Sequence, residues 1–424
     1  MMQSTYPLER DLGMRYYASD TDGVGGKLRS TPEDFIVEEI PLDDKGGTTG
    51  PYLICSLTKK NWELQHAVKE IANRLGISHR RIGWGGTKDR NAVTRQRISI
   101  YNVTPEQVAA IRLKDITIEP VGFANASLSL GDLQGNRFDL MIRDVELDQL
   151  EENMREITST VADGVPNYFG LQRFGAIRPV THAVGEWILR GDYEQAVVTY
   201  VGMAFPGEAD YVQKIRSSFV ATRDPVPALQ NLPSQMSYER AMLHHLHNHP
   251  GDYGGSLLEL PPKLLSMFVS AYQSYLFNCA LSLRFDRGYL LTDPVPGDQL
   301  IFANGRVDTV TAENTKAVFL HIARGRCGIA LFMPGREPLE GITGGDGTMA
   351  MLLAEHGITA GDFDKASKFV RTKFDGAWRP IALKTIVEYS IDQMGVRLKF
   401  TLPPGHYATT VCREYMKADP IRMI

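Results

Sequence analysis

Strand-like segments occur near both ends of the 424-residue chain, and a helix-rich stretch, residues 180–286, lies between them. Segments rich in β-branched and aromatic residues, typical of strands, occur at 34–40, 52–59, 116–124 and 137–145, and a hairpin-like pair at 385–403. The simplest arrangement is one α+β domain formed from both ends of the chain, with a second domain inserted between them. At roughly 100–200 residues per domain, the length permits two or three domains.

The strands and helices do not alternate in the regular βαβ order of a doubly wound fold. Residues 61–76 predict an amphipathic helix, because apolar side chains recur at helical spacing and a glycine ends the segment. Residues 146–164 predict an acidic helix, and residues 262–288 a long apolar helix that begins near a proline. We therefore expect a mixed, largely antiparallel sheet with flanking helices.

The composition excludes several classes of protein. No run of 18 apolar residues is present, so no membrane-spanning helix is expected. The first residues, MMQSTYPLERDLG, lack the basic region and apolar stretch of a secretory signal. The four cysteines are far apart and form no CxxC motif, which indicates reduced thiols and a cytoplasmic location.

A lone acid lies among bases in GWGGTKDRNAVTRQRISI, residues 83–100. Between Arg74 and Arg97 the chain has seven bases and one acid, Asp89, although the formal net charge of the whole chain is −4. Such a stretch predicts either a surface that binds phosphate groups or an ordinary solvated charged face.

The spacing in this stretch excludes two phosphate-binding motifs. A P-loop requires GxxxxGK followed by Ser or Thr, but here Lys88 follows Thr87, and Asp89 occupies the place of the hydroxyl. The dinucleotide motif GxGxxG fails because its third glycine is missing. A carboxylate at this position would also repel a phosphate group.

A single catalytic carboxylate fits the same residues. Lys88 and Arg90 flank Asp89 and favour its ionised form, which can act as a nucleophile or stabilise an ion pair. Gly85 and Gly86 would let the backbone approach a substrate closely. An ordinary turn remains the alternative, since Gly and Asp are common in turns, and this stretch alone does not decide between them.

A histidine cluster, HHLHNHP, is the strongest candidate for a metal site. His245 and His249 are four residues apart and could face the same side of a helix, with His244 and His247 beside them. No acid lies within the cluster, and the following Pro-Gly pair ends a helix there. We therefore expect surface histidines and no metal.

The segment GTKDRNAVTRQ resembles the signature loop of the TruD family of pseudouridine synthases, which reads roughly GxKDxxAxTxQ. Five further segments resemble that family in its order: KLRSTPEDFIVEEI at 27–40, GNRFDLMIR at 135–143, PNYFGLQRFG at 166–175, AYQSYLFNCALSLR at 271–284 and LPPGHYATTVCREYMK at 402–417. One such motif would be weak evidence, but six in order are strong. Some family members lack much of residues 190–260, so the histidine cluster is not expected to share in the chemistry.

The resemblance implies an isomerase that converts uridine to pseudouridine in RNA, most often at uridine 13 of tRNA, without cofactor or metal. The base is detached from C1′, turned and reattached through carbon, and it must first leave its stack. The essential aspartate of the family corresponds to Asp89, either as a nucleophile or as a group that assists cleavage. The alternative is a non-catalytic RNA-binding or RNA-remodelling protein with the same fold.

Three further residues are assigned roles by the same resemblance. Lys27 stands where the family places a base near the aspartate, and an ion pair there would keep Asp89 charged; a surface lysine is the alternative. Phe138 corresponds to the aromatic residue that stacks on the target uracil, unless it is a plain core residue. Asn136 would share a face with Phe138 and bond the base or the aspartate, or serve a turn. The bases expected to contact RNA phosphates are Arg80, Arg81, Lys88, Arg90 and Arg173.

The implied fold is a pseudouridine-synthase catalytic domain, with a mixed, largely antiparallel sheet, and an inserted α/β domain specific to the family. We place the catalytic domain at residues 1–165 with 384–424 and the inserted TruD-specific domain at 166–383. The expected partner is tRNA, read by its shape and by splayed-out bases. No membrane is expected as a partner. The oligomeric state does not follow from the sequence, and a monomer is the simpler expectation.

Overall fold

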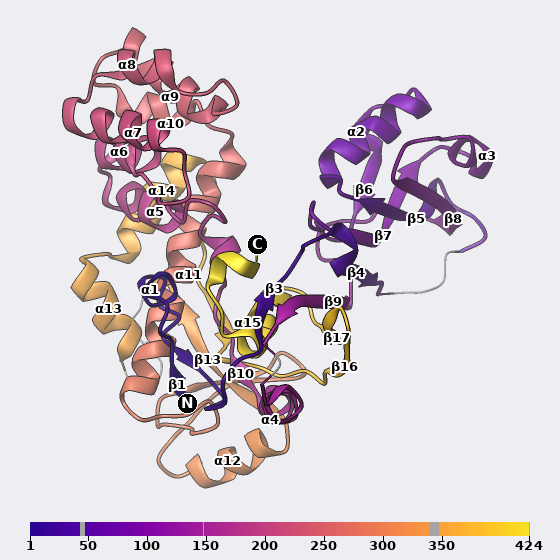
Figure 1. Ribbon diagram of the computed structural model, residues 1–424, viewed down its shortest axis with the longest axis vertical. Coiled ribbons are helices and arrows are strands. Elements are labelled where there is room, and N and C mark those ends of the chain that lie inside the picture. The colour runs from indigo at the N-terminus through magenta and orange to yellow at the C-terminus, as the bar shows by residue number, and fades with distance from the viewer. Residues whose placement is uncertain (43–46, 147, 339–346, 424) are drawn as a thin grey trace. The chain divides into compact units, whose positions relative to one another are not determined.

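The structure is a computed structural model that describes residues 1–42, 47–146, 148–338 and 347–423 (Figure 1). The chain divides into two compact units, which are described one at a time. Unit 1 consists of Met1–Tyr17 and Pro166–Leu383, and unit 2 of Ala18–Val165 and Lys384–Ile424. Residues 1–17 therefore group with residues 166–383, whereas the expected catalytic domain begins at residue 1.

The N-terminal segment belongs to unit 1 because its backbone lies against helix α11 (Pro262–Asp286). The Asn278 side chain donates a hydrogen bond to the carbonyl of Leu12 at 3.0 Å, and Ser282 Oγ donates to the carbonyl of Gly13 at 2.6 Å. A Cβ atom at Gly13, where φ is +75°, would lie 2.8 Å from the backbone nitrogen of Cys279. These contacts depend on tertiary packing, so the local sequence pattern does not predict them.

Unit 2 is built on a mixed sheet, and the described residues form nine strands of it. The main order is β16-β17-β9-β4-β7-β5-β8, with β3 beside β9 and β6 beside β7. Only β4 and β7 pair in parallel among these described strands; their neighbours pair antiparallel. The α+β class with a large mixed sheet is therefore confirmed. The strands are β3 (Gly25–Lys27), β4 (Phe35–Ile40), β5 (Tyr52–Lys60), β6 (Ile82–Trp84), β7 (Val93–Tyr101), β8 (Ile116–Ala124), β9 (Gly135–Val145), β16 (Glu388–Asp392) and β17 (Gly395–Leu402).

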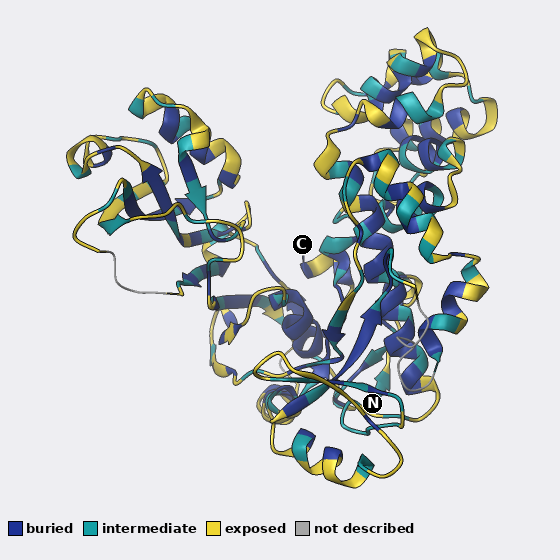
Figure 2. Cartoon of the chain, turned by 180° about the vertical axis from the view of Figure 1, so that it is seen from behind, coloured by how far each residue is buried: buried dark blue, intermediate teal, exposed yellow. Residues whose placement is uncertain are grey.

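Helix α2 (Leu64–Leu75) covers one face of this sheet at β5, β6 and β7. Its apolar stripe, including Val68 and Ile71, packs on strand residues such as Leu57 and Ile98, and its other side is exposed (Figure 2). The helix starts later than expected because the Glu63 side chain caps it, accepting a hydrogen bond from the backbone N–H of the third residue that follows. The other elements of unit 2 are α3 (Pro105–Ala109), α4 (Leu150–Asp163) and α15 (Ala408–Met416).

Unit 1 combines helices with a four-stranded antiparallel sheet in the order β12-β11-β13-β14. Helix α11 is its central element, and most of its side chains are buried because neighbours surround it. The helices are α1 (Pro7–Asp11), α5 (Thr181–Arg190), α6 (Tyr193–Gly202), α7 (Asp210–Thr222), α8 (Pro225–Asn231), α9 (Ser237–Asn248), α10 (Tyr253–Leu258), α12 (Thr315–Ala323), α13 (Thr348–His356) and α14 (Ala360–Val370). The sheet strands are β11 (Gln299–Phe302), β12 (Val307–Thr309), β13 (Cys327–Met333) and β14 (Ala377–Pro380).

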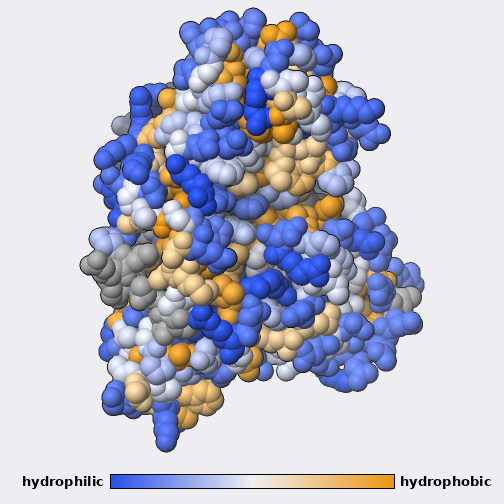
Figure 3. Space-filling view, turned by 90° about the vertical axis from the view of Figure 1, so that its left-hand side faces the viewer, coloured by the Kyte–Doolittle hydropathy of each residue, from blue (hydrophilic) through white to orange (hydrophobic). Residues whose placement is uncertain are grey.

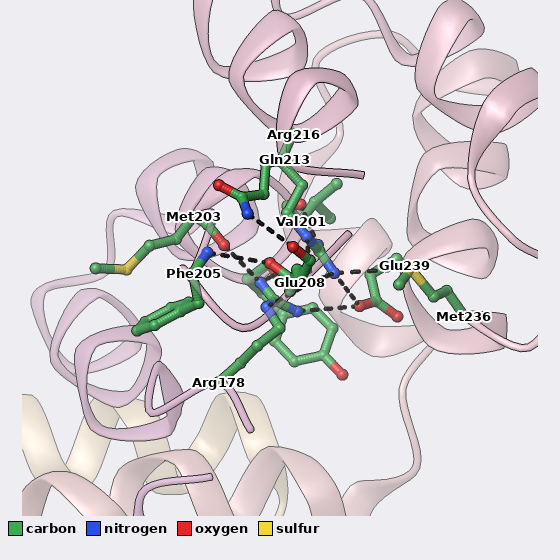
Figure 4. Close-up of polar contacts among 10 residues, drawn as sticks. Arg178, Val201, Met203, Phe205, Glu208, Gln213, Arg216, Met236 and Glu239 are labelled. Carbon is green, nitrogen blue, oxygen red and sulfur yellow. Dashed lines mark hydrogen bonds and ion pairs between the residues drawn. The ribbon is translucent and has the colours of Figure 1, made fainter. Parts of the chain in front are cut away.

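A buried charge cluster holds the helical part of unit 1 together (Figure 4). Arg216 Nη2 lies 2.8 Å from Glu208 Oε1 and 3.3 Å from Glu239 Oε1. Arg178 Nη1 lies 3.1 Å from the same oxygen of Glu239. Arg216 also donates to the carbonyl of Val201 at 2.6 Å. Two guanidinium groups and two carboxylates offset one another, as buried charges require, and they tie the segment between α6 and α7 to helix α9.

The surface drawn in Figure 3 is mainly hydrophilic, with apolar side chains scattered in patches between polar ones. Within the described ranges, the structure contains no helix that is both long and apolar enough to cross a membrane.

Candidate active site

One face of the unit 2 sheet brings together side chains from five strands. Lys59 of β5 lies opposite Thr94 of β7, and Thr94 lies opposite Val37 of β4. Val37 in turn lies opposite Phe138 of β9, which lies opposite Phe400 of β17. Because directly paired residues project from the same face of a sheet, these five side chains form one row across it.

A second row, two residues along each strand, contains polar side chains on the same face. Gln96 lies opposite Leu57, and Asn136 lies between Glu39 and Leu402. Glu39 and Gln96 are buried, and Asn136 is half-buried. Polar groups at inward positions of a sheet need partners, and the loop before β7 supplies them to Glu39 and Gln96.

The loop between β6 and β7 lies over these two rows. The buried carboxylate of Glu39 pairs with Lys88 Nζ at 2.6 Å and accepts a hydrogen bond from the backbone N–H of Arg97 at 3.0 Å. The Gln96 side-chain nitrogen donates to the carbonyl of Gly86 at 2.9 Å. Lys59 Nζ donates to the carbonyl of Asp89 at 2.8 Å. Three strands therefore each supply a side chain that fixes this loop.

Asp89 is the residue that this loop presents. Its Oδ2 atom accepts a hydrogen bond from Arg29 Nη2 at 3.1 Å. The Arg29 side chain is 8% exposed, whereas that of Asp89 is 44% exposed, so a buried cation supports a carboxylate that solvent or a ligand can reach. The backbone of Arg29 has φ of +58°, a conformation uncommon outside glycine and often found at functional sites.

The expected ion pair between Lys27 and Asp89 was wrong. Lys27 Nζ pairs with Asp144 Oδ2 at 2.7 Å, and both side chains are at least half exposed. Lys27 ends strand β3 and lies opposite Arg143 of β9, a register that directs it toward Asp144. Arg29, two residues further along, occupies the position expected for Lys27 because the chain turns there.

Phe138 belongs to a set of aromatic rings that reaches the cation beside Asp89. It stacks on Phe400 with ring centroids 5.4 Å apart and meets the edge of Phe35 at 6.5 Å. The Arg29 guanidinium lies 4.0 Å from the centroid of the Phe35 ring. Phe138 is 7% exposed, so in this structure other rings cover most of it. The set of Phe35, Phe138 and Phe400 is called the aromatic set below.

Unbonded acceptors mark the same face. Among the residues that the structure describes, Asn136 Oδ1, Thr94 Oγ1 and Gln96 Oε1 are buried without a hydrogen-bond partner. Leaving a buried polar atom unbonded typically costs about 1–3 kcal/mol. A bound molecule with an N–H or O–H donor would remove that cost at Asn136, which is half-buried.

The glycines of the loop serve the fold of the chain itself. A Cβ atom at Gly85 would lie 2.7 Å from the carbonyl oxygen of Asp132, and one at Gly83 would lie 2.3 Å from Ser127 Oγ. The carbonyl of Gly85 also accepts a hydrogen bond from the backbone N–H of Gly131 at 2.8 Å. Close packing of segment 127–132 therefore explains Gly83 and Gly85, and of these two only Gly85 was expected, together with Gly86, to let a substrate approach closely.

The bases predicted to contact RNA occupy different environments. Arg80 and Arg90 are exposed. Arg81 is half-buried, donates to the carbonyls of Tyr101 and Asn102 and lies over the Tyr101 ring. Lys88 is buried against Glu39, which does not fit a contact with phosphate, because its charge is already paired inside the protein.

Arg173, the last of these bases, belongs to unit 1, whereas Asp89 belongs to unit 2. Its Nε atom donates to Ser274 Oγ at 3.0 Å, and its guanidinium lies 5.9 Å from the Phe169 ring centroid. These contacts give Arg173 a structural role within its own unit.

One residue of the histidine cluster, His245, links helix α9 through polar contacts to residues that flank helix α10. His245 contacts Asp252 Oδ2 at 2.9 Å through Nε2 and Glu259 Oε1 at 3.2 Å through Nδ1. The hydrogen bond with Asp252 raises the pKa of His245, and the second carboxylate acts in the same direction. Across the described part of the chain, no three His, Cys, Asp or Glu side chains are placed to hold a metal ion. The four cysteines are free thiols.

Three residues of the site were missed in the sequence. Glu39 and Lys59 had a usable signal, because each follows inward apolar residues at alternating positions of a strand: Phe35 and Val37 before Glu39, and Cys55 and Leu57 before Lys59. A charged residue in the buried phase of a strand marks either a structural pair or a site. Arg29 had no such signal, since 60 residues separate it from Asp89.

Comparisons with known proteins agree along nearly the whole chain. The family model described as tRNA pseudouridine synthase D (TruD) matches residues 11–415. The chain is 39% identical to the probable tRNA pseudouridine synthase D of Methanococcoides burtonii, over 100% of both proteins. It is 38% identical to the corresponding protein of Thermococcus onnurineus, over 95% of this chain and 97% of that relative.

A solved structure is similar over the same length. It is the crystal structure of the putative tRNA pseudouridine synthase D (TruD) from Methanosarcina mazei, with 36% sequence identity and a TM-score of 0.83. The match covers 99% of this chain and 100% of that one. The similarity therefore extends through both units.

Proposed function

We propose that this chain, which belongs to the TruD family of tRNA pseudouridine synthases, isomerises uridine 13 of tRNA with Asp89 as its catalytic carboxylate. The family membership makes the chain a tRNA pseudouridine synthase, an isomerase. The uridine at position 13 and the role of Asp89 are the proposed part. Unit 2 is the catalytic domain in this proposal, and the segment 166–383 of unit 1 is the inserted domain specific to the family.

The main support for the proposal is that the loop between β6 and β7 exposes the Asp89 carboxylate. That carboxylate is exposed, while the backbone of the loop at Gly86 and Asp89 and the Lys88 side chain are fixed to the sheet. Arg29 places a buried positive charge beside one carboxylate oxygen, and a carboxylate can serve as a nucleophile. An ordinary turn, the alternative interpretation of the sequence, would not need four side chains from other segments to hold it.

The reaction rearranges bonds within one nucleotide. The bond from C1′ to N1 breaks, a bond from C1′ to C5 forms, and the proton lost from C5 is balanced by one gained at N1. Asp89 attacks the nucleotide or assists the cleavage, and the buried, unbonded Oδ1 of Asn136 is an acceptor for a uracil N–H once the base reaches it. The aromatic set offers an apolar wall for the base.

The target base has to leave its stack before it reaches Asp89, because a stacked base hides the atoms that react. Flipping costs a few kcal/mol in typical cases, which contacts to the flipped base and to the backbone must offset. Expected sources of backbone contact are the exposed bases Arg80 and Arg90. A cytoplasmic location, expected from the sequence, would give access to tRNA.

The direct test is to incubate the native protein with an unmodified tRNA transcript and to map pseudouridine by position. We expect conversion at position 13 and none in a matched transcript that carries cytidine there. Conversion at another position would agree with pseudouridine synthase activity, but it would show that uridine 13 is not the target. Tight binding of tRNA without conversion would favour the alternative, a non-catalytic RNA-binding protein.

Neutralising the two exposed bases near the loop should weaken RNA binding. We expect Arg80→Gln with Arg90→Gln to raise the Kd for tRNA and to reduce the slope of log K against log salt by roughly 1–2, since each phosphate contact contributes about 0.7–0.9. Binding is measured by filter retention or anisotropy over a salt series.

The matched control changes the same charge elsewhere on the surface. Arg324 and Arg326 are exposed residues that follow helix α12, and Arg324→Gln with Arg326→Gln alters the net charge equally. An equal loss of slope in both double variants would show that net charge, and not the surface around the loop, governs binding.

A further inference from the structure

We propose that Lys59 is a positioning residue, which fixes the backbone of Asp89 and keeps a buried positive charge close to its carboxylate. The proposal rests on the catalytic role of Asp89 proposed above. It concerns a lysine that no motif of the family-like loop contains, and that the structure alone brings to the site.

Lys59 is hydrogen-bonded to two different segments of the chain. Its side chain is 0% exposed at the end of β5. The Nζ atom donates to the carbonyl of Trp62 at 2.7 Å and to the carbonyl of Asp89 at 2.8 Å. Trp62 follows β5, and Asp89 lies in the loop between β6 and β7, so neither carbonyl belongs to the strands beside it. The ammonium group joins these two segments directly.

Burying an ammonium group is unfavourable unless its charge is offset. Within the described residues, the hydrogen bonds of Lys59 go to backbone carbonyls, and no carboxylate lies within ion-pair distance of it. A methionine at this position would fill the same space without burying a charge, but it would remove the donor that the carbonyls of Trp62 and Asp89 share. The neighbouring Lys60 points to the other face, where it pairs with Glu33 at the surface.

Burial and the charged groups around Lys59 set its pKa. Burial lowers the pKa of Lys59 to about 8, while Asp89 and Glu63 act to raise it and Lys88 acts to lower it. The other charges at this point are paired: Arg29 with Asp89, and Glu39 with Lys88. Lys59 is therefore mostly charged at neutral pH and loses its charge as the pH rises through about 8.

The sign of this effect separates catalysis from folding. The unfolded chain holds the lysine proton up to its ordinary pKa near 10.5, so between about 8 and 10.5 the unfolded state binds more protons than the folded state. The contribution of Lys59 to stability therefore rises with pH in this window. Its contribution to catalysis should fall in the same window, because the positive charge near Asp89 disappears.

The test compares steady-state conversion of tRNA by the native protein, Lys59→Met, Lys59→Arg and Lys60→Met between pH 6 and 10. For the native protein, we expect kcat to fall as the pH rises through about 8. Lys59→Met should lower kcat by about 30–100-fold at pH 7, with KM changed less than about 3-fold, because the loop is misplaced but the substrate surface is intact. Lys60→Met should leave both parameters and the pH profile unchanged.

Lys59→Arg keeps the proposal testable if Lys59→Met does not fold. A guanidinium group stays charged over this range, so we expect partial activity without the fall near pH 8. A fall near pH 8 that persists in Lys59→Arg would overturn the proposal, as would native kcat in a folded Lys59→Met. An inactive native protein would instead refute the proposed function, while an active one with unchanged Lys59 variants refutes only this inference.

Discussion

Replacing Asp89 with asparagine should reduce pseudouridine formation on the order of 10⁴-fold, a typical loss when a principal catalytic group is removed. The amide has nearly the same shape, so the hydrogen bond from Arg29 and the loop contacts of Lys59 and Gln96 should survive. What disappears is the negative charge and the nucleophilic oxygen. The effect should therefore appear in kcat, with the KM for tRNA close to native.

The measurement is steady-state conversion of an unmodified tRNA transcript over a range of concentrations, with pseudouridine mapped at position 13. Asp144→Asn provides a matched control, because Asp144 is an exposed aspartate that pairs with Lys27, and its φ of +54° suits asparagine well. That variant should keep native activity. If Asp89→Asn retains a rate within about tenfold of native, Asp89 is not the catalytic carboxylate.

Replacing Lys88 with methionine should lower the free energy of unfolding by about 3–5 kcal/mol, because it leaves the buried charge of Glu39 without its partner. The two side chains are 5% and 1% exposed, so water cannot replace the lost ammonium group. The same change should loosen the loop that carries Asp89 and reduce activity as well. Unfolding is followed in urea by tryptophan fluorescence at neutral pH.

A double variant tests whether the loss of stability comes from leaving one charge of the Glu39–Lys88 pair without its partner. Changing Glu39 to leucine together with Lys88→Met removes both charges, and it should recover much of the lost stability, since well-packed apolar replacements of buried pairs are often neutral. The exposed pair of Lys60 and Glu33 provides the control, because Lys60→Met should cost less than about 1 kcal/mol. A double variant as unstable as Lys88→Met alone would contradict the coupling of these two charges.

The elements of unit 2 were largely predictable because each has a regular local pattern. Strand β8 has the bounds that its composition suggested, and β5 differs by one residue at its end. Helix α2 was located by its apolar stripe, and only its first turn was wrong, because the Glu63 cap is a single side-chain contact. The spacing of apolar residues shows which face of an element is buried. This pattern can be seen in the sequence without knowing what the element packs against.

The candidate site was predictable only in part. Asp89 stood out as a lone acid among bases, and the resemblance to the TruD family assigned it a role. The partners of the charged residues were predicted less well: Lys27 pairs with Asp144, and Lys88 is buried with Glu39. Charged side chains pair with whatever lies within a few ångströms, and that depends on strand register and loop path, which sequence spacing does not contain.

By itself the sequence determined the α+β class, the family and the loop that carries Asp89. Periodic burial and glycine-rich motifs are local properties, so they can be seen in the order of residues. Only the tertiary structure decided that Arg29 supports the carboxylate, that Lys59 and Gln96 hold the loop, and that residues 1–17 join unit 1. These choices join residues far apart in the chain, and the free energy that selects them arises only when the strands and loops are packed together.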